Sequence, residues 1–261
     1  MPVEVTVLIA DAPQIPPLRA ESPIRGSVLY FSETNLASAL ENIRAHHPKV
    51  VAVESAFAES AAGEIRKMVA LDGHAGPKAI NVQPEFLEWL SDPIKNGAGA
   101  LFDFGCYGAN LMTWLMDNQR PRTVTAITQQ FQPDVYPRVD DEATIVLEYP
   151  TAQGIIQASW NWPFNRKDLE VYGRHGLAIA TGGSGLRVGL PNEPEHAVTP
   201  EPRAADERDA ISHLMAVVRN KRAPNGLSSL ENNLIVTEIL EAALESARTH
   251  TPVALTRDSR D

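Results

Sequence analysis

The spacing of apolar residues divides the chain into a short N-terminal part and a longer remainder. In the first part, continuous apolar runs predict buried strands over residues 3–11, 27–32 and 48–57. Apolar residues at helical spacing predict a helix over 32–47. We therefore expect a short αβ segment over residues 1–62.

From residue 63 onward the pattern changes to many short β-type runs. A strand is expected over 63–73 and an irregular loop up to about residue 96. Further strands are expected over 124–131, 143–150, 154–162, 168–173, 176–180 and 185–190. The turns between these later runs are short, and short connections favour antiparallel hairpins over parallel crossovers.

Three helices are predicted in this second part, over residues 97–116, 206–221 and 229–249. The last helix carries an apolar stripe that would face a core. The stripe consists of Leu230, Leu234, Ile235, Ile239 and Leu240. The predicted fold class is α+β, a mostly antiparallel open sheet with helices on one face, in a domain spanning 63–261.

Composition narrows the possible partners. The 261 residues carry a formal net charge of −10, which argues against nucleic acid or an anionic membrane surface as a partner. No apolar run is long enough to span a bilayer, and the N-terminus lacks a basic, signal-like region. We expect a cytoplasmic protein. The single cysteine, Cys106, excludes an internal disulfide and a Cys-based zinc cluster.

Polar side chains interrupt the apolar helix predicted over 97–116. Asp103, Tyr107 and Asn110 stand at i, i+4 and i+7, which places them on one helical face. Either this face lines a binding site, or each residue has a separate structural reason. In the structural alternative, Asp103 lies in the first helical turn, where the helix dipole stabilises an acidic side chain. Tyr107 is then a core aromatic residue, and Asn110 lies at the surface.

Other motifs in the sequence predict no site of their own. There is no G-x-G-x-x-G, P-loop, H-E-x-x-H or G-x-S-x-G pattern. His46 and His47 are neighbours, so on a helix their side chains point apart and a metal site is not expected. We interpret Cys106 as a small buried apolar residue and Lys95 as a solvated lysine.

Three segments together resemble a known family. The segment 97–116, "GAGALFDFGCYGANLMTWLM", is similar to the glycine run, Asp-x-Gly-x-His/Tyr pattern and helix of the Gfo/Idh/MocA oxidoreductases. The segment 140–180 resembles that family's sheet region with its Gly-x-x-Gly turn, here Gly173 to Gly176. The segment 232–255 resembles its last helix and closing strand. Residues 63–261 therefore resemble the family's C-terminal substrate and dimerisation domain.

This resemblance implies an NAD(P)-dependent oxidoreductase acting on a sugar-like or polyol substrate. Asp103 and Tyr107 would be the catalytic pair, and Gly97, Gly99 and Asn110 would line the substrate site. Alcohol oxidation moves a hydride to the nicotinamide of NAD or NADP and a proton to a positioned base. The open sheet face would form a homodimer.

The chain also departs from the family pattern. Neither the nucleotide-binding glycine fingerprint nor the Glu-Lys-Pro motif, with its catalytic lysine, occurs in the sequence, so no cofactor-binding residue is identified. Two interpretations stay open: an oxidoreductase whose cofactor half comes from elsewhere, or a non-catalytic protein that binds a ligand and dimerises. Lys95 precedes the glycines, but its position alone does not make it a replacement lysine.

The first 62 residues resemble, in part, half of a response-regulator receiver. Asp11 follows the first strand, and Glu54 stands near the phospho-acceptor position. Glutamate cannot serve as the acceptor, and the later receiver strands are not visible. A signalling fusion is thus a third, weaker hypothesis.

Overall fold

The computed structural model describes residues 63–182, 185–199, 204–206, 209–219 and 221–255. The expectations for the αβ segment at 1–62, including the receiver resemblance and the His46–His47 pair, lie outside these residues. Two compact units are distinguished, and in their described parts the sheet belongs to one and helix α7 to the other. Each unit is described by itself.

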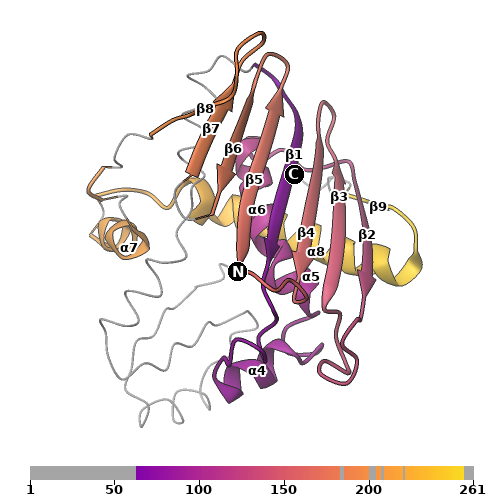
Figure 1. Cartoon of the computed structure of the whole chain (residues 1–261). Helices are drawn as coiled ribbons and strands as arrows, with labels where there is room; N and C mark the ends of the chain where they lie inside the picture. The colour runs from indigo at the N-terminus through magenta and orange to yellow at the C-terminus, as the bar shows by residue number, and fades with distance from the viewer. Residues whose placement is uncertain (1–62, 183–184, 200–203, 207–208, 220, 256–261) are drawn as a thin grey trace, which may run out of the picture. The chain divides into compact units, whose positions relative to one another are not determined.

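A nine-stranded sheet forms the larger unit, with the strand order β8-β7-β6-β5-β1-β4-β3-β2-β9 (Figure 1). The strands are β1 (Ile65–Gly73), β2 (Thr123–Gln129), β3 (Glu142–Glu148), β4 (Gln153–Ser159), β5 (Arg166–Gly173), β6 (Leu177–Thr181), β7 (Gly185–Gly189), β8 (His196–Ala197) and β9 (Val253–Ala254). All pairings are antiparallel except β1 with β4. The expected α+β class with a mostly antiparallel open sheet is confirmed.

The parallel pair places the first strand in the middle of the sheet. After β1 the chain runs through helices and the β2–β3 hairpin before β4 returns beside β1. β5 then pairs with the other edge of β1. Strands far apart in sequence thus become neighbours, and hairpin rules alone do not predict this arrangement.

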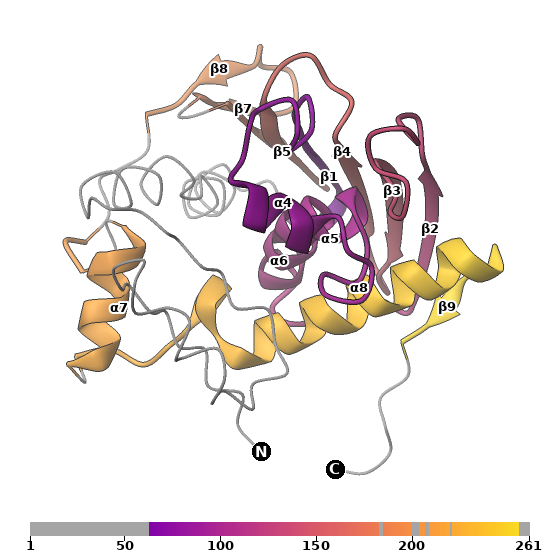
Figure 2. The ribbon, with the colours of Figure 1, turned by 90° about the horizontal axis from the view of Figure 1, so that it is seen from below.

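Helices α4 (Pro84–Leu90), α5 (Ala100–Asp103), α6 (Gly105–Leu115) and α8 (Leu230–Thr249) lie on one face of the sheet (Figure 2). Helix α4 falls where the sequence predicts an irregular loop. It starts at a proline, whose fixed φ suits the first helical turn. Helix α8 begins at the Ser229 cap, whose side chain accepts a hydrogen bond from the Asn232 N–H.

The helix predicted over 97–116 is two helices rather than one. Phe104 separates α5 from α6 and has φ −105° and ψ −29°. At this junction Gly105 lies against the sheet, where an added Cβ would be 3.1 Å from Ile145. The two short helices each pack on the strands: α5 on β3 and β4, and α6 on β1 and β4.

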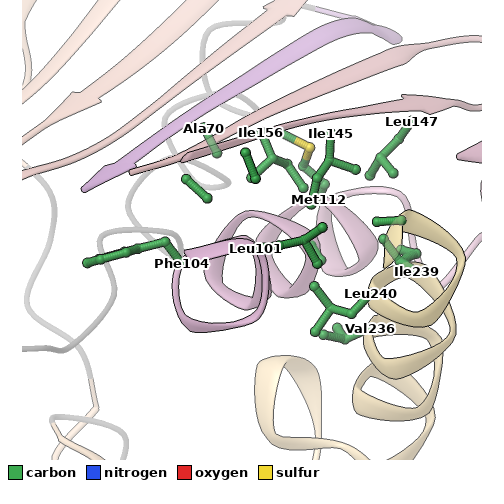
Figure 3. Packing of buried hydrophobic residues seen from close by; sticks show 14 of the residues in the cluster. Ala70, Leu101, Phe104, Met112, Ile145, Leu147, Ile156, Val236, Ile239 and Leu240 are labelled. Atoms are coloured by element: carbon green, nitrogen blue, oxygen red, sulfur yellow. The ribbon is translucent and has the colours of Figure 1, made fainter. Parts of the chain in front are cut away.

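The core lies between the sheet and these helices (Figure 3). Inward-facing strand residues meet apolar residues of α5, α6 and α8. The labelled members of this cluster are Ala70, Leu101, Phe104, Met112, Ile145, Leu147, Ile156, Val236, Ile239 and Leu240. Gly108 brings α6 close to the sheet, because a Cβ there would lie 2.7 Å from Ile156.

The opposite sheet face is not covered by α4, α5, α6 or α8 (Figures 1 and 2). Alternation along the strands puts the half-buried Val69, Leu71, Val146 and Ile155 on it. Ile127 in β2 is 67% exposed. We call these five residues the open-face cluster.

The smaller unit is described through helix α7 (Ala210–Val218), within the predicted 206–221. Asp209 caps it by accepting a hydrogen bond from the Ser212 N–H at 2.8 Å. Across the described residues, no helix combines the length and apolar character needed to cross a membrane.

Candidate functional site

Asp103 is the last residue of α5, and its carboxylate is held by a tryptophan. The indole Nε1 of Trp160 donates to Asp103 Oδ2 at 2.8 Å. Trp160 is fully buried just after β4, and its ring packs against that of Tyr136 with centroids 4.8 Å apart. A rigid aromatic donor thus fixes the direction of this carboxylate.

The surroundings of Asp103 adjust its protonation near neutral pH. Burial raises the pKa of Asp103 to about 6, while the Trp160 hydrogen bond and the positive charge of Lys167 act in the opposite direction. A carboxylate with this pKa can accept a proton from a bound hydroxyl or return one.

Tyr107 lies one turn further on, in α6, and shares a lysine with Asp103. The Nζ of Lys167 is 3.7 Å from the centre of the Tyr107 ring and 5.7 Å from that of Phe104. Tyr107 is 39% exposed. Even so, desolvation, followed by the charges of Cys106, Asp103 and Asp72, raises the pKa of Tyr107, so its phenol stays protonated and can donate.

Two further charged residues join this site from the sheet. Asp72 of β1 and Lys167 of β5 are direct cross-strand partners. Alternation puts Asp72 on the same face as the buried Met68 and Ala70, and it is itself only 3% exposed. The sequence analysis did not predict either residue. A usable signal exists, because each charged residue stands in line with alternate buried apolar residues of its strand. We name Asp72, Asp103, Tyr107 and Lys167 the Asp103 cluster.

His74 follows β1 beside this cluster. Its Nδ1 accepts a hydrogen bond from the Gly76 N–H at 2.9 Å, so the proton of the neutral ring is on Nε2. Its ring meets the Phe104 ring edge-on, with centroids 4.8 Å apart. Burial lowers the pKa of His74, and the charge of Lys167 adds to this, so the ring is neutral at pH 7.

Asn110 makes contacts within the protein. Its amide nitrogen donates to the backbone oxygen of Leu227 at 3.0 Å and to Asn233 Oδ1 at 3.2 Å. These bonds join α6 to the short helix η2 (Gly226–Ser228) and to α8. The substrate role expected for Asn110 stays a prediction, and the contacts seen here are structural.

The two glycines before α5 are required by the protein's own packing. At Gly99 an added Cβ would lie 1.8 Å from the backbone oxygen of Asp140. Gly97 has φ +96°, and a Cβ there would lie 2.9 Å from the Phe102 ring. Gly97 also lines a surface hollow of about 400 Å³ whose lining does not include Asp103 or Tyr107. Close approach of a ligand is not needed to explain either glycine, and their substrate role stays a prediction.

The start of α5 cannot serve as a phosphate cradle. Asp140 accepts hydrogen bonds from the Gly99 and Leu101 N–H groups at 2.8 and 2.7 Å, so a carboxylate of the protein already fills this position. Within the described ranges, no strand leads through a glycine-rich turn into another helix start that could hold a dinucleotide. The same ranges contain no group of three residues suited to a metal ion.

Cys106 and Lys95 take no part in the cluster's chemistry. The Cys106 thiol donates to the backbone oxygen of Asp103 at 3.3 Å, and burial raises its pKa to about 12, so it is not a nucleophile. Lys95 pairs with Glu88 at 2.8 Å, and about half of its side chain is exposed.

Comparison with known proteins connects this geometry to a family. A family model described as "GFO/IDH/MocA C-terminal domain" matches residues 50–179, about half of the chain. The trans-1,2-dihydrobenzene-1,2-diol dehydrogenase of Sus scrofa is 25% identical over 163 residues, which cover 61% of this chain and 44% of that protein. The receiver resemblance has no support among these matches.

Solved structures share the fold at low identity. An aldose-aldose oxidoreductase from Caulobacter crescentus, complexed with glycerol, has a TM-score of 0.66 and 20% identity over 81% of this chain and 62% of its own. An inositol dehydrogenase homolog from Azotobacter vinelandii, complexed with NADH and myo-inositol, has a TM-score of 0.62 and 16% identity, again over 81% and 62%. The chain spans less than half of the curated relative and about three fifths of these structures.

Proposed function

The chain belongs to the Gfo/Idh/MocA family through its C-terminal domain, and on this premise we propose that it binds a sugar-like polyol at the Asp103 cluster. In this proposal the sheet domain is the substrate half of an NAD(P)-dependent oxidoreductase. The named relatives support the substrate class, since they include a dihydrodiol dehydrogenase and proteins complexed with glycerol and with myo-inositol.

The proposal rests mainly on the orientation and the raised pKa of the Asp103 carboxyl group. Its carboxylate is fixed by the Trp160 indole, and its pKa is raised to about 6. It can therefore accept a hydrogen bond from a substrate hydroxyl and take its proton as a base. Tyr107, protonated and one turn away, would donate to the same or a neighbouring oxygen.

A nicotinamide cofactor, when bound, would accept the hydride from the carbon that bears the reacting hydroxyl. The described residues do not fit a dinucleotide, because Asp140 occupies the start of α5. The cofactor would have to be held by residues outside the described ranges or by another polypeptide. The part assigned to the described residues is substrate binding, orientation and proton transfer at Asp103.

A non-catalytic ligand-binding protein is the second candidate. It is favoured by the missing glycine fingerprint and Glu-Lys-Pro motif, and by the filled start of α5. Titration of the full chain with NADH and NADPH, followed by nucleotide fluorescence, separates the two candidates. Micromolar binding of either nucleotide supports an oxidoreductase in which this chain holds the cofactor, and no binding excludes that form and supports the ligand-binding protein.

The substrate assignment has its own test in thermal unfolding with and without myo-inositol. A ligand that binds only the folded state raises the melting temperature. The wild-type chain should be stabilised, and Asp103→Asn should lose most of that stabilisation. If myo-inositol stabilises both proteins equally, Asp103 does not hold the ligand.

We also propose a homodimer formed through the open-face cluster. Half-buried aliphatic residues lie there on the face that α4, α5, α6 and α8 do not cover, and Ile127 is largely exposed. Apolar area of this kind gains free energy when a second surface removes it from water.

A further inference from the structure

The Asp103 cluster contains a cation that the proposed reaction does not yet use. Lys167 comes from β5, directly across from Asp72 of β1, while Asp103 comes from α5 on the same sheet face. Three elements that are distant in sequence thus bring one ammonium group and two carboxylates together.

The aromatic rings restrict where the ammonium group lies. Lys167 Nζ is 3.7 Å from the centre of the Tyr107 ring, close enough for a strong cation–π contact, and 5.7 Å from that of Phe104. Phe104 stands at the junction of α5 and α6, where its side chain points away from α8 (Figure 3). The Tyr107 ring, one turn from Asp103 in sequence, therefore fixes where the ammonium group lies.

Electrostatics agree with this placement. Burial lowers the pKa of Lys167, and the charges of Asp72 and Asp103 oppose that shift. In turn, Lys167 lowers the pKa of Asp103. The two groups therefore affect each other's charge, as residues that share one site do.

Resting on the proposed function, we propose that Lys167 is a substrate-binding residue that donates a hydrogen bond to one oxygen of the ligand while Asp103 accepts one from the neighbouring hydroxyl. A donor and an acceptor side by side match two adjacent hydroxyl groups, one of which accepts while the other donates. The preferred ligand is thus a neutral vicinal diol.

Charge also selects against acidic ligands. The carboxyl groups of Asp72 and Asp103 stand beside the single ammonium group of Lys167, and His74 is neutral at pH 7. A sugar acid or a sugar phosphate would bring a further negative charge next to these two carboxyl groups, whereas an uncharged polyol would not. Lys167 thereby binds an oxygen without turning the cluster into an anion site.

Calorimetric titration with myo-inositol tests the proposal on the full chain. Lys167→Met should weaken binding about 10-fold or more, because a hydrogen bond from a charged donor is lost. Lys167→Arg, which keeps a charged donor, should retain part of the affinity. The matched control is Lys67→Met, on the opposite face of β1, which should bind as the wild type does. L-Tartrate should bind more weakly than myo-inositol.

A second measurement does not require any ligand. The Trp160 indole proton reports the charge of Asp103 by nuclear magnetic resonance, since the two are hydrogen-bonded. Its resonance should titrate with a midpoint near pH 6 in the wild type and at higher pH in Lys167→Met, because the cation that favours the charged carboxylate is gone. The other groups around Asp103 — Asp72, His74, Cys106, Tyr107 — are unchanged in this comparison.

The outcomes separate the two proposals. If Asp103→Asn abolishes binding but Lys167→Met binds normally with an unshifted midpoint, the Lys167 role is wrong and the proposed function stands. If the wild type binds no polyol, the proposed function is contradicted. The Lys167 role, which requires a bound polyol, is contradicted with it, and the midpoint then reports only the charge coupling between Lys167 and Asp103.

Discussion

At the scale of single residues, Asp103 is costly to the fold. Its pKa, about 6 against an ordinary 3.8, means that the folded protein holds the proton more tightly than the unfolded chain does. Stability is therefore lost as pH rises from about 4 to about 6, and the loss is about 3 kcal/mol for a shift of this size. Retaining such a carboxylate is easier to understand at a functional site than in a structural core.

The first prediction concerns Asp103→Asn. Asparagine can still accept a hydrogen bond from the Trp160 indole but never becomes charged. The variant should therefore not lose stability between pH 4 and pH 6 as the wild type does. At pH 7 its free energy of unfolding should exceed that of the wild type by about 1 to 3 kcal/mol, with little difference at pH 4. Urea unfolding at the two pH values measures this.

Asp92→Asn is the control of opposite sign. Hydrogen bonds from the Ile94 and Lys95 N–H groups lower the pKa of Asp92, and the positive charges of Arg138 and Lys95 act in the same direction. Its contribution to stability is present above the unfolded pKa and disappears as pH falls, so Asp92→Asn should be less stable than the wild type at pH 7. Equal behaviour of the two variants would show that Asp103 is not desolvated.

At the scale of elements, the segment before α5 is built around one contact. Gly99 lies against the backbone of Asp140, and the Asp140 side chain accepts from the Gly99 and Leu101 N–H groups. This contact connects the start of α5, and with it Asp103, to the loop before β3. The contact between Gly99 and Asp140 therefore helps to position the Asp103 carboxylate.

The second prediction is that Gly99→Ala destabilises the domain by about 3 kcal/mol or more. Its Cβ would lie 1.8 Å from the Asp140 backbone oxygen, so the backbone must move. Gly182→Ala is the matched control: its φ of +49° is unfavourable for alanine, but nothing lies within 4 Å of the added Cβ. That variant should lose only about 1 kcal/mol. Similar losses in chemical denaturation would contradict the packing argument.

Sequence patterns predicted some of these elements well. The last helix, expected over 229–249, is α8 at Leu230–Thr249, and the later strands follow the expected runs. Local periodicity suffices for the positions of these elements. It is only partly right about the buried face of α8: Ile235, Ile239 and Leu240 are buried as expected, whereas Leu230 and Leu234 are about half exposed. The break at Phe104 was not predicted, because it depends on how Gly105 meets the sheet.

Only part of the candidate site could be predicted from the sequence. Asp103 and Tyr107 lie close in sequence, so helical spacing and the family pattern indicated them together. Lys167 joins them only because β5 pairs with β1, and Asp72 only because alternation along β1 turns it inward. Pairing between strands so distant in sequence depends on the whole topology.

At the scale of the whole molecule, the third prediction is association through the sheet face that α4, α5, α6 and α8 leave open. Ile127→Asp should shift the protein from dimer to monomer, because it places a charge in an apolar contact. Ile94→Asp is the control, since Ile94 is 92% exposed in a loop outside the open-face cluster. Sedimentation of both variants measures the change, and a wild type that is monomeric at every concentration would contradict the dimer.

The Trp160 indole proton provides the most direct test of polyol binding at Asp103 and its cluster. Trp160 touches Asp103, whereas Trp114 lies near Gly226 at the other end of α6 and serves as an internal reference. On addition of myo-inositol to the wild type, the Trp160 resonance should shift and saturate while that of Trp114 stays in place, and Asp103→Asn should show no such shift. An unchanged Trp160 resonance, or equal shifts of both tryptophans, would contradict polyol binding there.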